Sequence, residues 1–229
     1  CAVLLTMTGS ATAEKQDLDV TPYLQVLGNP YQSTYTKGPK VYARNIWDIC
    51  AFRGRLYLGA GNSSNVGPAA NVGPVPIICY DPATKQFSEM LEVDDEQIDI
   101  FRCLAGQLYV PGHDPRESWE LGNFYRLERD GKWAKHRSIP KGIHNYDMAY
   151  RGGTLFAGLG AQSPSIAVSG NLGRTWKVTG PTNWRVSSFL ESDGLVYAAG
   201  EFPPAAFLAK VKKEGHEIPV SCWEYSPGD

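Results

Sequence analysis

A short motif recurs four times along the chain and limits what this chain can fold into. In each copy a glycine begins a run that holds an apolar residue followed by an aromatic ring. The four copies are Gly54-Arg55-Leu56-Tyr57, Gly106-Gln107-Leu108-Tyr109, Gly153-Thr154-Leu155-Phe156 and Gly194-Leu195-Val196-Tyr197. Four copies in register, each followed by a further strand-turn-strand pattern, indicate one supersecondary unit repeated along the chain.

The clearest unit spans residues 144–178. Two strand-like runs flank the pair Gly152-Gly153, and glycine reaches the positive φ angles that a tight hairpin turn requires. A polar break at 161–165 separates them from two more runs, which flank a turn at 170–173. The pattern predicts a four-stranded antiparallel meander.

The spacing of the copies favours one architecture. The glycines are 52, 47 and 41 residues apart, and periods of about 40–50 residues with four strands each are typical of β-propeller blades. We therefore predict an all-β fold, a β-propeller of four-stranded antiparallel blades. At least four blades are expected, at 45–91, 97–138, 144–178 and 185–225, in one domain over 14–229. Because four blades is the lower limit for a closed propeller, we expect a fragment of a larger one.

The beginning of the sequence resembles part of an export signal. Residues 2–8 are apolar, and the small residues Ala11-Thr12-Ala13 stand just before Glu14. This pattern is typical of the second half of a signal peptide, so residues 1–13 are predicted to be its remnant. A lipoprotein that begins at Cys1 is the rival interpretation. Either one predicts a secreted or periplasmic protein.

The overall charge excludes some classes of partner. The chain has 22 basic and 24 acidic residues and a net charge of −2, so no strong field favours nucleic acid or an anionic membrane. No run reaches the roughly 20 apolar residues of a membrane span. We expect no nucleic-acid partner and no membrane span.

The cysteines do not indicate a metal site. Cys50, Cys79, Cys103 and Cys222 follow the predicted leader, and they form no Cys-x-x-Cys motif and no cluster with metal-ligand spacing. Buried free thiols are one interpretation, because cysteine packs as a small apolar residue. Export would permit a disulfide, but the sequence does not fix its pairing. We predict no metal, and the sequence leaves any cofactor unknown.

One turn resembles a known family motif. The run Ser169-Gly-Asn171-Leu-Gly173-Arg-Thr175-Trp176 resembles the Asp-box of sialidase-like propellers, also called BNR repeats, with Asn171 in place of the usual aspartate. Asparagine can still accept backbone hydrogen bonds in such a turn. In that family the Asp-box turns lie opposite the active site. The resemblance therefore implies that the starts of the first strands line the functional face.

Counting from the four glycines gives the residues expected on that face. Nine residues before them stand Asn45, Gln97, His144 and Arg185; seven before, Trp47, Asp99, Tyr146 and Ser187; seven after, Gly61, His113, Gly160 and Glu201. Residues two apart on a strand share a side, so these rows are expected at one mouth of a central channel. Two long insertions, at 62–75 and 113–121, border it, and Arg116 lies in the second.

These residue types suit an acidic glycan, because aromatic faces stack on sugar rings and arginine pairs with carboxylates. We predict His144 and Tyr146 as catalytic residues. The predicted substrate-binding residues are Arg185, His113, Asp99, Arg116, Trp47 and Glu201. The predicted partner is a carbohydrate or another small polar ligand, with a protein partner as a further option. A polar rim that is merely solvated is the plain alternative.

Two chemistries and one non-catalytic role fit this face. A sialidase would need three arginines and a tyrosine nucleophile, but the Arg-Ile-Pro motif expected near that family's amino terminus is absent. A polysaccharide lyase would need an arginine to neutralise a uronate and a His/Tyr pair to move the proton. A propeller that only binds glycans or proteins would need neither, so the sequence leaves enzyme activity open.

Overall fold

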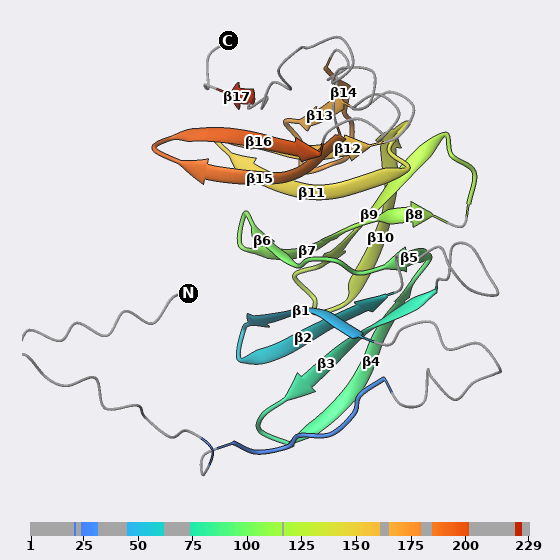
Figure 1. Ribbon diagram of the computed structural model, residues 1–229, viewed down its shortest axis with the longest axis vertical. Helices are drawn as coiled ribbons and strands as arrows, with labels where there is room; N and C mark the ends of the chain where they lie inside the picture. The colour runs from blue at the N-terminus through green and yellow to red at the C-terminus, as the bar shows by residue number, and fades with distance from the viewer. Residues whose placement is uncertain are drawn as a thin grey trace, which may run out of the picture.

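The chain is all-β in the computed structural model, which confirms the predicted fold class at that level. The structure describes residues 21, 24–31, 45–61, 74–115, 117–160, 165–179, 185–201 and 223–225. Within these residues the ordered elements are antiparallel strands joined by turns (Figure 1). None of the described segments forms a helix with the length and apolar character needed to cross a membrane. The predicted leader at 1–13 lies outside the described residues.

The first repeat is a meander of four strands in sequence order. Its strands are β1 (Asn45–Phe52), β2 (Arg55–Gly61), β3 (Val75–Asp81) and β4 (Gln86–Val93). Each strand pairs antiparallel with the next. The apolar strand β3 is buried over six of its seven residues, whereas seven of the eight residues of β4 are exposed or half-buried. The meander therefore has an inner and an outer side, as its hydrophobic pattern predicts.

The second and third repeats have the same order of pairing. The second contains β6 (Arg102–Leu104), β7 (Gln107–Pro111), β9 (Leu121–Leu127) and β10 (Trp133–Pro140), and the third contains β11 (His144–Arg151), β12 (Thr154–Gly160), β13 (Ser165–Ser169) and β14 (Lys177–Val178). Two strands are shorter than the sequence predicts: β6 starts at Arg102, not near Ile98, and β14 has only two residues.

The fourth repeat departs from the prediction at its outer edge. Strands β15 (Arg185–Ser192) and β16 (Leu195–Glu201) form the expected hairpin. However, β17 (Trp223–Tyr225) pairs directly with β16. In the blade predicted at 185–225, a strand at 206–211 and an outer strand within 216–225 are expected to follow the hairpin, whereas the structure pairs 223–225 directly with β16. Residues 206–211 themselves lie outside the described residues.

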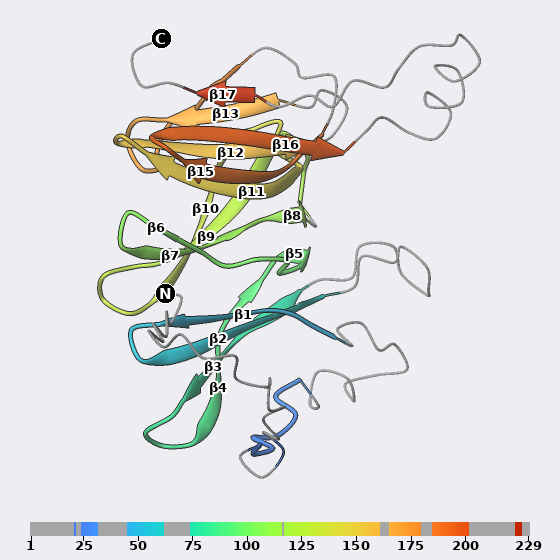
Figure 2. The same cartoon turned by 60° about the vertical axis from the view of Figure 1, so that its left-hand side comes forward.

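Two short strands that the sequence does not predict connect the repeats at one end of the molecule. They are β5 (Asp95–Gln97) and β8 (His113–Pro115). β5 pairs with β2 and with β8, and β8 pairs with β11. The first and third repeats therefore belong to a single ten-stranded sheet (Figures 1 and 2).

The four repeated glycines are equivalent hairpin positions, as predicted. Gly54, Gly106, Gly153 and Gly194 have φ angles of 75, 73, 84 and 87°. The residue before each of them also has positive φ, between 49 and 54°. Two successive residues with positive φ are the geometry of a type I′ turn, whose twist matches that of the flanking strands.

The hydrophobic core lies between repeats. One buried cluster joins the first and second repeats, a second joins the second and third, and a third joins the third and fourth. In the first of these, the Trp133 ring lies 5.9 Å from Tyr57 and 6.3 Å from Phe101, measured between ring centroids. The repeats are stacked as layers that share apolar faces (Figure 2).

The Asp-box-like turn is held by its own side chains. Asn171 Oδ1 accepts the backbone N–H of Thr175 at 2.9 Å, and Ser169 Oγ accepts the N–H of Gly173 at 2.9 Å. The indole N–H of Trp176 lies 3.1 Å from the carbonyl of Gly173. Asparagine therefore accepts the backbone hydrogen bond expected at this place.

The first strands of three repeats each contain a bulge, and two of these bulges place a carboxylate that contacts another repeat. The register shifts between Ile46 and Asp48 in β1, and at the equivalent places in β11 and β15. After the β1 bulge, Asp48 Oδ2 accepts the backbone N–H of Phe101 at 2.6 Å. A bulge leaves one residue unpaired and re-aims its neighbours, which lets this carboxylate reach the next repeat.

Asp147, at the equivalent bulge of β11, joins three repeats. Its carboxylate is 1% exposed and pairs with Arg102 through two bonds of 2.7 Å. The same carboxylate accepts the backbone N–H groups of Phe189 and Met148 at 2.7 Å. Arg102 belongs to the second repeat and Phe189 to the fourth. The hydrogen bond and charge of Asp147 outweigh the effect of burial and raise the pKa of Arg102.

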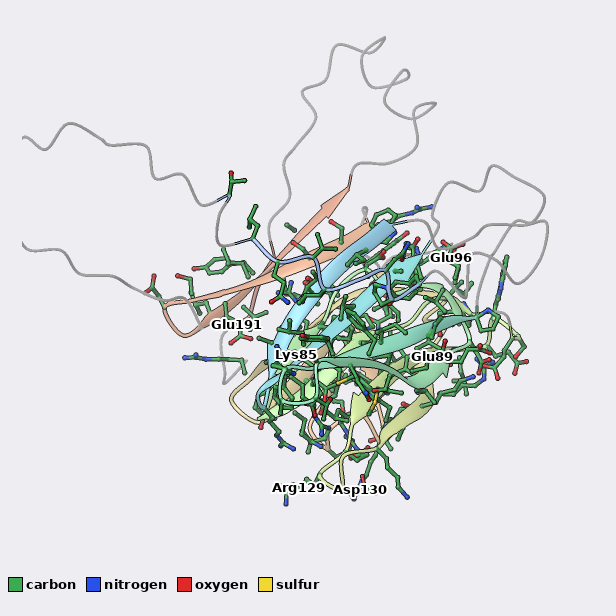
Figure 3. All side chains as sticks on the ribbon, turned by 90° about the horizontal axis from the view of Figure 1, so that it is seen from below. Lys85, Glu89, Glu96, Arg129, Asp130 and Glu191 are labelled. Carbon is green, nitrogen blue, oxygen red and sulfur yellow. The ribbon has the colours of Figure 1, made fainter. Side chains whose placement is uncertain are left out.

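We predict that Asp147→Ala lowers the free energy of unfolding by about 3–5 kcal/mol, because it leaves a partly buried guanidinium and buried amides without their acceptor. Urea unfolding followed by tryptophan fluorescence measures the change. Glu89→Ala, an exposed acidic residue of β4 (Figure 3), is the control and should change stability by less than about 0.5 kcal/mol. Equal loss in the two variants would contradict a joining role for Asp147.

Candidate functional site

The candidate site lies at the end of the molecule where the first strands begin. It is formed by β5, β8 and the start of β11. Three side chains come from neighbouring positions across these strands, because Gln97 pairs with His113 and His113 pairs with His144. Residues directly opposite each other on antiparallel strands have close Cβ atoms. The row Gln97, His113 and His144 is therefore fixed by the backbone pairing.

Three aromatic rings meet at this row. The His113 ring lies 5.6 Å from His144 and 4.8 Å from Tyr146, both edge to face. The rings of His144 and Tyr146 are stacked at 5.5 Å with an interplanar angle of 11°. Two imidazoles and a phenol, three groups that can exchange protons, thus lie against one another.

The position of Tyr146 is set by the bulge of β11, because the strand register shifts between Asn145 and Asp147. A glycine makes room for its ring: a Cβ on Gly160 would lie 2.2 Å from Tyr146 Cε2 and 3.2 Å from Arg185 Cγ. The guanidinium Nη1 of Arg185 donates to the Tyr146 hydroxyl at 3.1 Å. The positive charge of Arg185 would stabilise negative charge on that oxygen.

Carboxylates hold both histidines through Nδ1. His113 Nδ1 lies 2.7 Å from Asp99 Oδ2, and His144 Nδ1 lies against Asp114 Oδ1. Burial alone would lower the pKa of His113, but the hydrogen bond and charge of Asp99, together with the charges of Asp114 and Glu96, outweigh it and raise this pKa. His113 is therefore favoured in its charged form.

Two acids of β5 are buried beneath the site. Glu96 is 2% exposed, and its Oε1 lies 3.9 Å from His113 Nε2. Burial, followed by the charge of Asp114, raises the pKa of Glu96 to about 7. Asp95 is fully buried, and its Oδ2 accepts hydrogen bonds from Tyr125 and Asn123. Burial raises the pKa of Asp95 to about 6, although these hydrogen bonds oppose the rise.

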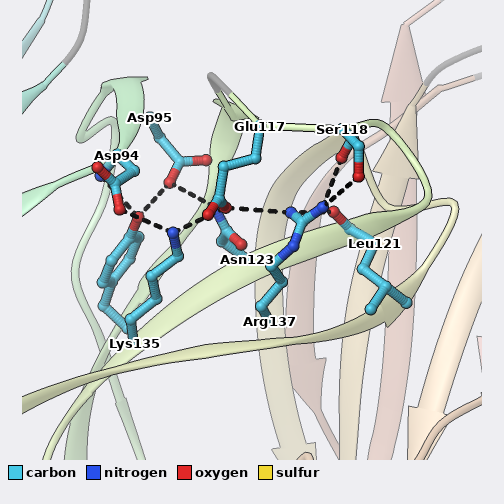
Figure 4. Close-up of polar contacts among 9 residues, drawn as sticks. Asp94, Asp95, Glu117, Ser118, Leu121, Asn123, Lys135 and Arg137 are labelled. Carbon is cyan, nitrogen blue, oxygen red and sulfur yellow. Dashed lines mark hydrogen bonds and ion pairs between the residues drawn. The ribbon is translucent and has the colours of Figure 1, made fainter.

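Ion pairs and hydrogen bonds hold the loop that follows β8 in place. Lys135 Nζ lies 2.7 Å from both Asp94 Oδ2 and Glu117 Oε2, and Arg137 Nη1 lies 3.2 Å from Glu117 Oε2 (Figure 4). Arg137 also donates to the Ser118 carbonyl at 2.6 Å. The loop carries Trp119, which is 57% exposed. An exposed indole on a fastened loop offers a flat apolar contact surface.

One group of side chains could hold a metal ion. Among the described residues, His113, Asp114 and His144 each offer a ligand atom, and these atoms lie within 4.8 Å of one another. Two imidazoles and a carboxylate are ligands that zinc accepts. The sequence predicts no metal here, because this set forms only when β8 and β11 pair.

The structure brings five of the predicted site residues together. Linked contacts run from Asp99 to His113, from His113 to His144 and Tyr146, and from Tyr146 to Arg185. Trp47 occupies the equivalent bulge in β1, where its Nε1 donates to the Gly61 carbonyl at 3.0 Å and its side chain is 45% exposed. Arg116 and the side chain of Glu201 lie outside the described residues, as do residues 62–73 of the first predicted insertion.

The sequence reasoning did not select Glu96, Asp114 or Gln97 as functional residues. Asp95-Glu96-Gln97 resembles a solvated turn in sequence, yet all three residues are buried. The count from the repeated glycines places Gln97 in the same row as His144 and Arg185 but gives it no role, and Glu96 and Asp114 stand next to Gln97 and His113 in the sequence. Asp114 has a φ of 56°, a conformation that aspartate and asparagine adopt more readily than most residues.

Asp95 predicts a pH-dependent stability. Its pKa is about 6 in the folded chain and near 3.9 when unfolded, so folding favours the protonated form. The stabilisation is fully present below pH 4 and is lost as the pH rises through 6, by roughly 3 kcal/mol. We predict that Asp95→Asn removes this part of the decline between pH 4 and 7.

Urea unfolding at several pH values measures the effect. Glu89→Gln is the control, since it removes an exposed carboxylate and should keep the wild-type pH profile. A parallel decline in wild type and Asp95→Asn would show that Asp95 does not retain its proton on folding.

Comparisons with known proteins find similarity only at the level of solved structures. No family model matches the chain, and no curated protein matches it. Among solved structures, the chain is similar to an α-L-arabinofuranosidase from Clostridium thermocellum, with 15% sequence identity and a TM-score of 0.44. The match covers 80% of this chain and 69% of that chain.

Proposed function

We propose that the repeats are blades of a β-propeller. The proposal is supported by the equivalent type I′ turns, the bulges at the same place in three first strands, and the apolar clusters between consecutive repeats. In a propeller the first strands surround a central channel, so residues at their beginnings gather at one mouth. The Asp-box-like turn at 169–176 would then lie on the opposite face.

We further propose that this mouth binds an acidic polysaccharide and cleaves it by elimination. The observation that carries the proposal is the group formed by His113, His144, Tyr146 and Arg185. Three proton-exchanging rings beside a guanidinium provide what a uronate needs, namely a partner for its carboxylate and groups that move a proton. A fold does not specify an activity, so this proposal is argued from the chemistry of the four side chains.

The mechanism assigns one task each to Arg185, His144 and Tyr146. Arg185 pairs with the uronate carboxylate, which stabilises the negative charge that develops when the neighbouring carbon loses its proton. His144 is the base that takes the proton from this carbon. Tyr146 donates its hydroxyl proton to the leaving glycosidic oxygen. One C–H and one C–O bond break, and a C=C bond forms in the sugar.

Binding without catalysis is the second candidate function. Trp47 and Trp119 expose much of their indole surface, as aromatic platforms for sugar rings do. A module of this kind would depend on these rings and on Arg185 but not on His144 or Tyr146. Incubation with a panel of uronate-containing polysaccharides separates the two functions, because elimination creates an unsaturated sugar that absorbs in the ultraviolet.

For the enzyme, we predict that Tyr146→Phe and His144→Ala each lower kcat by about 100- to 10,000-fold, the usual contribution of a general acid or base. The thermal unfolding midpoint of Tyr146→Phe should stay within about 2 °C of wild type, because the ring and its stacking are retained. Chelator-treated protein should keep its activity. Full activity in Tyr146→Phe, or loss of activity on chelation, would contradict the assigned proton transfer.

We predict that Arg185→Ala weakens binding of an acidic oligosaccharide by about 10- to 100-fold and that of a neutral one by much less, because it removes a charged hydrogen-bond donor. Calorimetry with a matched pair of uronate and neutral oligosaccharides measures this. Arg129→Ala is the control: Arg129 is exposed in the β9–β10 turn and lies far from Glu96 in Figure 3. Equal weakening toward both ligands would contradict a carboxylate-binding role.

A further inference from the structure

Two cysteines from different repeats lie side by side. Cys50 is on β1 and Cys103 is on β6, and their sulfur atoms are 3.9 Å apart. Cys50 is half-buried and Cys103 is exposed, which differs from the expectation of buried thiols; only Cys79 is fully buried among the described cysteines. A disulfide needs sulfur atoms about 2.05 Å apart, so this pair is within reach of bonding if the side chains rotate toward each other.

The backbone on both sides of the pair is fixed. Asp48 Oδ2 accepts the N–H of Phe101 at 2.6 Å, and Arg53 Nη2 donates to the carbonyl of Gly106 at 3.2 Å. Both contacts join residues 53 positions apart, and Cys50 and Cys103 are separated by the same 53 positions. The first strands of the two repeats therefore run alongside each other in constant register, and the thiols meet between two anchors.

We propose that Cys50 and Cys103 are a disulfide site that ties the first repeat to the second when a small-molecule disulfide, such as oxidised glutathione, is present. This inference is independent of the proposed enzymatic function. The bond would lie toward the hairpin ends of these strands and away from the site at their beginnings. It would supply the pairing that the sequence leaves open.

The exposed sulfur is the point of entry. Cys103 lines a depression of about 280 Å³ together with Arg102, Phe189 and Glu191. Its thiolate attacks the glutathione disulfide, which forms a mixed disulfide and releases one glutathione thiol. Cys50 then loses its proton to water and attacks the Cys103 sulfur, which releases the second glutathione. The two cysteines lose two electrons and two protons, and the glutathione disulfide is reduced to two thiols.

The environment of Cys50 does not stabilise the reduced pair. Burial, followed by the neighbouring Cys103, raises the pKa of Cys50 to about 12. A dithiol is protected from oxidation when one thiolate is stabilised, as in strongly oxidising disulfide enzymes. Here the thiolate of Cys50 is disfavoured, so the reduced pair lacks that protection.

Peptide mapping of the full chain tests the proposal. The reduced protein is incubated with oxidised glutathione, remaining thiols are alkylated, and the chain is digested with trypsin. We expect peptides 45–53 and 103–116 to be recovered as one species lighter than their sum by two hydrogen atoms, with the Cys79 peptide alkylated. Recovery of 45–53 and 103–116 as separate alkylated or glutathionylated peptides would overturn the proposal, provided that urea-unfolded protein reacts under the same conditions.

Two single variants separate the steps. Cys50→Ser should retain glutathione on Cys103, whereas Cys103→Ser should leave Cys50 unmodified, because only Cys103 is exposed. The wild-type protein should not retain glutathione on Cys103. If it does, as Cys50→Ser should, then Cys50 cannot complete the exchange and the proposal fails.

Thermal unfolding gives a readout of the strand geometry. The cross-linked chain should unfold about 5–10 °C above the reduced chain, and a reductant should reverse the gain, because the bond closes a loop of more than 50 residues in the unfolded state. A lower unfolding temperature would show that the strands distort to form the bond, contrary to the register described above.

Discussion

The buried carboxylate of Asp147 is the interaction on which the arrangement of the later repeats depends. A carboxylate removed from water is costly unless it is fully paired, and this one has a guanidinium and two backbone amides as partners. Those partners come from the second, third and fourth repeats. An apolar cluster lies between each pair of consecutive repeats, but apolar contacts have no preferred direction. Hydrogen bonds are directional, so they set the distance and angle between the repeats. Asp48 does the same between the first and second repeats.

Much of the framework could be predicted because it is local. A glycine at each tight turn and an apolar run on each side specify a hairpin whatever the rest of the chain does. The rows counted from those glycines predicted that His144, Tyr146 and Arg185 begin neighbouring first strands, and the structure brings them into contact. Counting residues from the glycines works here because the hairpin turn and the bulge are separated by the same number of residues in each first strand that has the bulge.

The parts that could not be predicted depend on partners far away in the sequence. Strand β5 (Asp95–Gln97) resembles a solvated loop, and it is buried because Tyr125, Asn123 and Lys135 meet its acids or their neighbours. Simple alternation also misses that Tyr146 sits in a bulge. Likewise, the sequence pattern gives no partner for Arg102, whereas the structure pairs it with Asp147. In each case a long-range polar contact overrides the local pattern.

The buried acids of β5 also make the net charge of the site depend on pH. Glu96 and Asp95, with pKa values of about 7 and 6, take up protons as the solution becomes mildly acidic. The surroundings of Arg185 thus become less negative as the pH falls, while the strands that carry these acids keep their positions. An anion near this site would therefore be attracted more strongly in mild acid than at neutral pH, because the buried acids that lie under the rings lose their negative charge.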